Sequence, residues 1–72
     1  MPKFSDRLKE LQTQKRVSQK DTAKAAGVTA RSIQYYEKEQ KEPTLSVLVR
    51  IADYFDVSLD YLVGRSDNPQ RQ

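Results

Sequence analysis

Cysteine and histidine are both absent from this chain of 72 residues. Their absence excludes disulfide bonds, the usual zinc sites, thiol nucleophiles and acid/base catalysis by imidazole. The acidic residues that are present follow the spacing of helix surfaces, and no nucleophile can be paired with a base in this inventory. We therefore predict that the protein is not an enzyme and holds no metal or cofactor.

Long apolar runs are absent as well. No segment approaches the roughly 20 apolar residues that are needed to span a bilayer. The first residues, MPKFSDR, become charged before any apolar stretch forms. These features favour a cytoplasmic protein with no membrane partner.

The composition that remains is typical of one small folded domain. Hydrophobic residues make up 36% and charged residues 32% of the chain, which is too apolar for a disordered protein. The balance of 13 basic to 10 acidic side chains gives a formal net charge of +3. Such a charge is a modest indication of a polyanionic partner.

The apolar residues are spaced as in helices, and the sequence shows no strand-like alternation, internal repeat or low-complexity block. Phe4, Leu8 and Leu11 recur at i, i+4 and i+7, which predicts a first helix over residues 4–14. Ser18 and Asp21 form a capping box that opens a second helix.

A tight turn is expected after the second helix. Gly27 can stop that helix because glycine adopts a positive φ, which costs other residues roughly 1 kcal/mol or more. Thr29 is suited to cap a third helix that continues to about residue 38. Ile33 and Tyr36 are its predicted core positions.

Two more helices follow a polar segment. Thr44 is suited to cap the fourth helix, whose apolar residues cover so wide an arc that we expect it to be the most buried; they are Leu45, Leu48, Val49, Ile51, Ala52 and Phe55. Ser58 is suited to cap a short fifth helix that ends at Gly64. The sequence thus predicts an all-α, compact five-helix domain over residues 1–64 and a flexible C-terminal tail over residues 65–72.

The third helix has a second face that differs from its apolar one. At ~100° per residue, the residues that gather there are Ala30, Arg31, Gln34, Tyr35 and Lys38. A helix held across a tight turn with its far face outward has the geometry that enters the major groove of DNA. Arg31 can bond O6 and N7 of guanine, and Gln34 can do the same with adenine. A helix face that is merely solvated is the alternative.

The segment 18–43 resembles the helix-turn-helix of lambda-type phage repressors and Cro, the XRE family of bacterial and phage regulators. The resemblance is carried by Gln19, Ala23, Gly27, Val28, Ile33, Tyr36 and Glu37. RLKELQ and IADYFDVSLDYLVGRSDNP are similar to the first and the last two helices of the same five-helix, lambda-repressor-like domain. The resemblance implies that the second and third helices form the helix-turn-helix.

It also implies roles for single residues. The base-reading positions correspond to Ala30, Arg31, Gln34 and Tyr35, and the phosphate-contacting positions to Ser18, Gln19, Thr29, Lys38 and Lys41. A plain solvated side chain is the competing interpretation for Gln19, Lys38 and Lys41. Tyr36, unlike its neighbour Tyr35, corresponds to a core position.

Three positions depart from the family's usual pattern. Thr22 stands where leucine is frequent, which reduces the buried apolar area. Gln12 replaces an arginine that pairs with the equivalent of Glu37, although the amide can still donate a hydrogen bond to that carboxylate. Glu39 replaces a glycine, so we expect a loop of different shape and a weaker assignment for Lys41.

The resemblance implies a sequence-specific DNA-binding transcriptional regulator, located at the nucleoid when it is bound to double-stranded DNA. A repressor is favoured, because occupying an operator that overlaps a promoter needs no further surface. Such regulators bind palindromic half-sites about one helical turn, ~34 Å, apart as homodimers. The expected dimer surface contains Leu59, Tyr61, Leu62 and Val63, with core packing as the competing explanation for Leu59 and Leu62.

An alternative function keeps the same fold. An antitoxin-like or other protein-interaction module would hold a second protein and bind DNA only secondarily. No ligand-sensing segment follows the fifth helix within these 72 residues, so we expect control through the amount of protein, a regulatory partner protein or dissociation of the dimer.

Overall fold

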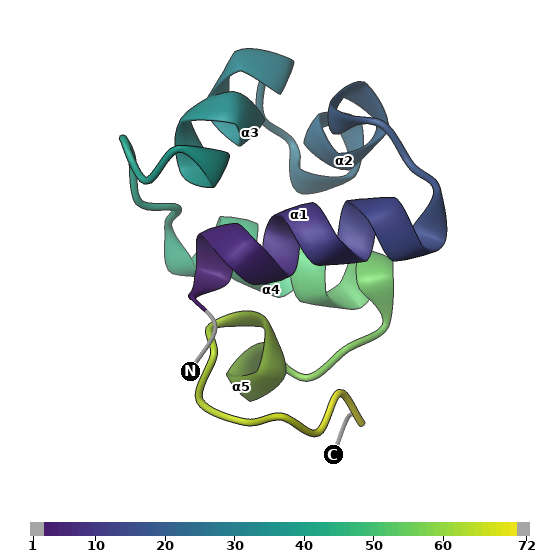
Figure 1. Ribbon diagram of the computed structural model, residues 1–72. Helices are drawn as coiled ribbons and strands as arrows, with labels where there is room; N and C mark the ends of the chain where they lie inside the picture. The colour runs from purple at the N-terminus through teal and green to yellow at the C-terminus, as the bar shows by residue number, and fades with distance from the viewer. Residues whose placement is uncertain (1–2, 71–72) are drawn as a thin grey trace.

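The computed structural model describes residues 3–70, which fold into five α-helices joined by short loops (Figure 1). The helices are α1 (Phe4–Lys15), α2 (Gln19–Ala26), α3 (Ala30–Glu37), α4 (Leu45–Phe55) and α5 (Leu59–Leu62). No strand occurs between residues 3 and 70. The all-helical prediction is confirmed.

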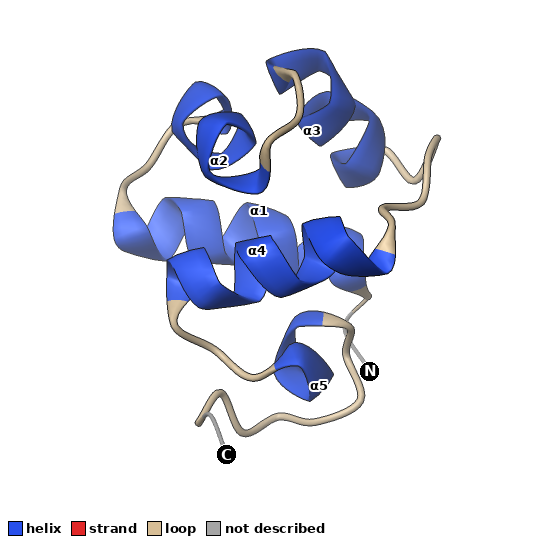
Figure 2. Ribbon diagram, turned by 180° about the vertical axis from the view of Figure 1, so that it is seen from behind, coloured by secondary structure: helices blue, strands red, loops and turns tan. Residues whose placement is uncertain are grey.

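The helices are arranged on two sides of α1 and α4. In Figures 1 and 2, α2 and α3 lie above the level of α1 and α4, and α5 lies below it. α3 packs on α1, α2 packs on α4, and α5 contacts both α1 and α4. The helix-turn-helix and α5 are therefore on opposite sides of the domain.

One hydrophobic core joins all five helices. Each helix contributes a side chain with no exposed surface, and these side chains are Leu8, Thr22, Ile33, Ile51 and Leu62. Thr22 also donates its hydroxyl to the carbonyl of Ser18 at 2.9 Å, so the polar atom that replaces leucine's apolar surface is hydrogen-bonded.

The predicted helix starts are confirmed by their caps. The side-chain oxygens of the four capping residues accept backbone N–H groups three residues later, and these residues are Ser18, Thr29, Thr44 and Ser58. Asp21 completes the capping box, because its carboxylate accepts the N–H of Ser18 at 3.4 Å. Short-range sequence signals therefore define where these helices begin.

α4 is less buried than predicted. Its core residues are Ile51, Ala52 and Phe55, whereas Leu45 is 67% and Val49 41% exposed. α2 and α5 approach α4 from two sides and leave a third side of the helix outward (Figure 2). The prediction that α4 is the most buried helix is wrong, because its apolar arc is wider than the surface that α2 and α5 cover.

Residues 65–70, which belong to the segment predicted to be a flexible tail, contact the domain, and the flexibility of that segment stays a prediction. The backbone N–H of Ser58 donates to the carbonyl of Pro69 at 2.9 Å. The guanidinium of Arg7 lies 3.8 Å from the ring centroid of Tyr61 and pairs with Asp67 at 3.1 Å. Arg7 is only 6% exposed, and this charged residue of α1 contacts both α5 and the segment after it. Residues 71–72 of the predicted tail lie outside the described part of the chain.

The loop after α3 adopts the backbone that a glycine would favour. Glu39 has a φ of 58°, in the left-handed region where a side chain costs ~1–2 kcal/mol. Its N–H donates to the carbonyl of Tyr36 at 3.2 Å. The replacement of glycine by glutamate is thus accommodated by backbone strain at Glu39.

Candidate nucleic-acid interface

The turn between α2 and α3 is closed at Gly27. This residue has a φ of 74°, and its N–H is directed at the carbonyls of Ala23 and Lys24. The N–H of Val28 donates to Ala23 at 3.0 Å, as is typical of a helix that ends in a left-handed residue. Val28 then packs against the core, so α3 begins with its direction fixed.

α3 divides into a buried and an outward side, as its periodicity predicts. Ile33 is fully buried and Tyr36 is 4% exposed, with the ring of Tyr36 edge-on to that of Phe4. The core position predicted for Tyr36 is confirmed. Arg31 and Gln34 are exposed, so a polar stripe faces away from the domain.

The predicted base-reading residues do not contribute equally to this stripe. Ala30 is half-buried and packs against the core, so it presents little side-chain surface. Tyr35 is half-buried, and the guanidinium of Arg31 lies 5.8 Å from its ring centroid. This cation–π contact places the charged and the aromatic group side by side, one turn apart on α3.

The start of α2 is adjacent to the outward side of α3. Gln19 donates its amide N–H to Glu37 at 2.9 Å and accepts an N–H from Gln34 at 3.3 Å. Gln12 of α1 also donates to Glu37, at 3.0 Å, which confirms the predicted Gln12–Glu37 hydrogen bond. The structure therefore joins a predicted phosphate-contacting residue to a predicted base-reading residue.

The other predicted phosphate-contacting residues lie around this centre. The hydroxyl oxygens of Ser18 and Thr29 accept backbone N–H groups as helix caps. The first N–H groups of any helix have no acceptor within the helix and favour an anion. Lys38 and Lys41 follow α3 and are exposed. Within residues 3–70, neither lysine forms an ion pair.

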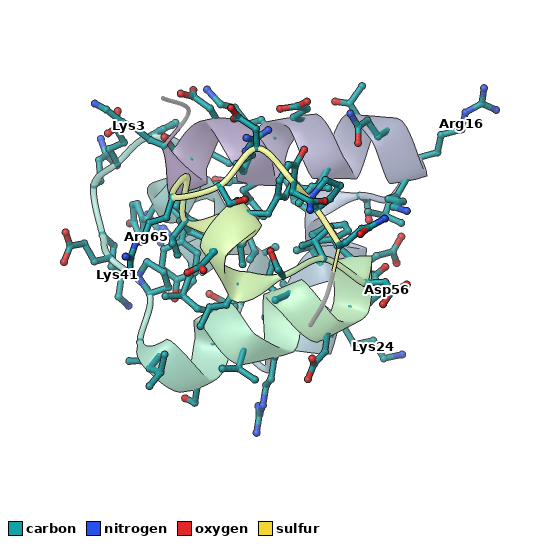
Figure 3. The ribbon with its side chains drawn as sticks, turned by 90° about the horizontal axis from the view of Figure 1, so that it is seen from below. Lys3, Arg16, Lys24, Lys41, Asp56 and Arg65 are labelled. Carbon is teal, nitrogen blue, oxygen red and sulfur yellow. The ribbon has the colours of Figure 1, made fainter. Side chains whose placement is uncertain are left out.

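Basic side chains are not confined to one patch. Figure 3 shows Arg16 and Lys41 at opposite ends of the molecule. The net charge of +3 therefore does not by itself locate a DNA-binding surface. The outward side of α3 is the candidate because of its position on the helix, opposite the buried residues.

Two residues of the predicted dimer surface belong to the core, and the dimer itself stays a prediction. Leu62 is fully buried and Tyr61 is 7% exposed, both within the core, so neither has a surface to offer a second chain. Leu59 and Val63 are half-buried. The competing explanation of core packing holds for Leu62, and it holds in part for Leu59, which packs against the core.

Two further findings concern other classes of site. None of the helices within residues 3–70 has the length and hydropathy of a membrane span. In the same part of the chain, no cluster of acidic side chains is placed to hold a metal ion.

The match to known proteins agrees with this geometry. The helix-turn-helix family model matches residues 8–62, and the chain belongs to this family, in its XRE type. It is 35% identical to the HTH-type transcriptional regulator YobD and 37% identical to YqaE, both of Bacillus subtilis strain 168, over 92% and 90% of its length. The chain spans only 59% and 56% of those two proteins.

The fold is that of a phage repressor domain. The P22 c2 repressor, solved in complex with a synthetic operator, superposes with a TM-score of 0.84 over 92% of this chain and 100% of its own. The sequence identity to this repressor is 21%. The predicted five-helix, lambda-repressor-like fold is confirmed.

Proposed function

We propose that this protein is a sequence-specific DNA-binding transcriptional regulator that inserts α3 into the major groove. The observation that carries this proposal is the separation of α3 into a buried apolar side and an outward polar side at a fixed turn. The relatives named as transcriptional regulators and the operator complex of the P22 c2 repressor support it.

The chemistry of the outward side matches base edges. Arg31 carries a planar fork of donors that fits O6 and N7 of guanine, and Gln34 has the donor and acceptor that fit adenine. The ring of Tyr35 beside Arg31 reduces the freedom of the guanidinium. A group that is ordered before binding loses less entropy when it binds.

Phosphate contacts then set the register of α3. Gln19 begins α2, and the first N–H groups of a helix, which have no acceptor within the helix, favour an anion. Lys38 and Lys41 add exposed positive charge after α3. Each phosphate that the protein contacts releases counterions. A plot of log affinity against log salt concentration therefore has a slope of about −0.9 per phosphate contacted.

We further propose that the regulator is a repressor that binds a palindromic operator as a homodimer, within the cytoplasm and at the nucleoid. A single α3 reads only a few base pairs, and two-fold pairing doubles the site. Leu59 and Val63 are the members of the predicted dimer surface that keep some exposure. Sedimentation of the protein with and without operator DNA tests the pairing.

Fluorescence anisotropy with a duplex from the protein's own promoter tests DNA recognition. We expect tighter binding to this duplex than to random DNA, and Arg31→Ala should reduce the difference. Arg65→Ala is the matched control, since it removes the same charge from the exposed segment after α5. Equal affinity of the wild-type protein for operator and random DNA would contradict the proposal, and binding only with a second protein would favour the interaction module.

A further inference from the structure

Four side chains from three helices form one hydrogen-bonded chain beneath the outward side of α3. The oxygen Oε2 of Glu37 accepts Nε2–H groups from Gln12 at 3.0 Å and from Gln19 at 2.9 Å. Nε2 of Gln34 donates to Oε1 of Gln19 at 3.3 Å. The chain therefore runs from a half-buried carboxylate to an exposed amide that faces away from the domain.

Only one direction of donation is compatible with this chain. A carboxylate accepts hydrogen bonds and cannot donate them, whereas an amide has a donor end and an acceptor end. Gln19 must therefore turn its nitrogen to Glu37, which leaves its oxygen toward α3. Gln34 must in turn direct its own nitrogen at that oxygen.

This order has a consequence for base recognition. One N–H of Gln34 is used by Gln19, and the second N–H and the oxygen remain available. Adenine presents an acceptor, N7, next to a donor, the N6 amino group. In one orientation, the N–H of the amide faces N7 and its oxygen faces the N6 amino group. An amide turned by 180° places its oxygen against N7 and its N–H against the N6 amino group, where neither can bond.

We infer that Glu37 is a positioning residue for DNA recognition, which acts through Gln19 to fix the orientation of the Gln34 amide and thereby its preference for adenine. The inference rests on the proposed function, since it needs Gln34 to read a base. It gives Gln19 a second role besides a phosphate contact. A phosphate contact alone affects all sequences alike, whereas the orienting role affects one base pair.

Variants of the protein separate the orienting role of Gln19 from its phosphate contact. Gln34→Ala first identifies the base pair that residue reads, as the position where preference is lost. Gln19→Met and Glu37→Met should then each reduce the preference at that base pair by about threefold to tenfold. In the Gln34→Ala background the same changes should leave the preference there unaltered.

Gln12→Met is the matched control. It removes the other hydrogen bond to the same carboxylate oxygen. Gln12 is 7% exposed, and its amide oxygen has no hydrogen-bond partner among residues 3–70. The variant should therefore keep the base preference within about twofold of wild type. Glu37→Gln should reduce the preference less than Glu37→Met does, because its amide oxygen can still accept the two N–H groups, whereas its amide nitrogen can also donate and the direction of donation is no longer fixed.

Several outcomes would overturn the inference. Gln19→Met lowering affinity equally for every duplex shows a phosphate contact alone, and a Gln12→Met effect as large as that of Glu37→Met shows general loosening of the domain. If Gln34→Ala does not change the base preference, Gln34 does not read a base and the inference is rejected. Circular dichroism establishes that each variant is folded, and Gln19→Met, at the half-buried first residue of α2, decides the question if Glu37→Met unfolds.

Failure of the inference is distinguishable from failure of the proposed function. Suppose that the wild-type protein prefers one duplex, but Gln19→Met and Glu37→Met have the same effect with and without Gln34. Only the positioning role is then rejected. If wild-type protein prefers no duplex over random DNA, both are rejected.

Discussion

Replacing Gly27 by alanine perturbs the turn that directs α3 outward. At a φ of 74°, an added Cβ costs ~1–2 kcal/mol. Alanine also gives the unfolded chain less conformational freedom than glycine does, which offsets ~0.5–1 kcal/mol of this cost. The new Cβ would also contact the guanidinium of Arg50, but Arg50 is an exposed, flexible side chain that can move away. The expected net loss is about 1 kcal/mol in the free energy of unfolding.

Thermal and urea unfolding followed by circular dichroism measure this loss. In a domain of this size, 1 kcal/mol corresponds to a decrease in Tm of roughly 4–8 °C. The same change in an Arg50→Ala background separates the two causes. If the cost comes from the backbone, it is the same in both backgrounds to within ~0.5 kcal/mol.

An unchanged or higher Tm for Gly27→Ala would show that the turn does not need a left-handed residue. A loss that disappears in the Arg50→Ala background would assign the cost to the side-chain contact. Either result contradicts the assignment of Gly27 as the residue that closes α2.

Other substitutions test other parts of the structure. Arg31→Ala should cost roughly 1–3 kcal/mol at the operator and relax the preference at one base pair; an equal loss on random DNA in anisotropy titrations argues against base reading. Glu39→Gly should have a free energy of unfolding in urea ~0.5 kcal/mol above that of Glu39→Ala, since both variants lose the ion pair with Lys3 and only glycine relieves the left-handed φ; no difference between the two variants would show that position 39 is unstrained. Arg7→Met should lower the free energy of unfolding by ~1–3 kcal/mol, because the hydrogen bonds of the guanidinium and its contact with Tyr61 are lost. Asp67→Ala should cost under ~0.5 kcal/mol, because the Asp67 side chain is 86% exposed, and a larger cost would show that the ion pair itself holds the segment.

The sequence predicts those features that depend on neighbouring residues. The caps Ser18 and Thr29 are local, because their oxygens bond N–H groups three residues away. The two sides of α3 follow from helical periodicity alone, which is why Ile33 and Tyr36 are correctly placed in the core. Gln12 and Glu37 are 25 residues apart, and their hydrogen bond was predictable only through the family resemblance.

The features that the sequence does not predict depend on contacts between distant parts of the chain. Arg7 and Asp67 are 60 residues apart, and no periodicity indicates that a charged residue of α1 is buried there. The exposure of Leu45 depends on which side of α4 its neighbours leave open. The burial of Leu62 depends on α5 packing against both α1 and α4.

The most direct measurement is an NMR titration of ¹⁵N-labelled protein with a preferred operator duplex. We predict that the largest changes occur in the side-chain signals of Arg31 and Gln34 and in the backbone signal of Gln19. Tyr54, which is 40% exposed on α4, is the control and should change little. Large changes at Tyr54 with unchanged Arg31 and Gln34 signals would show that DNA binds elsewhere than on the outward side of α3.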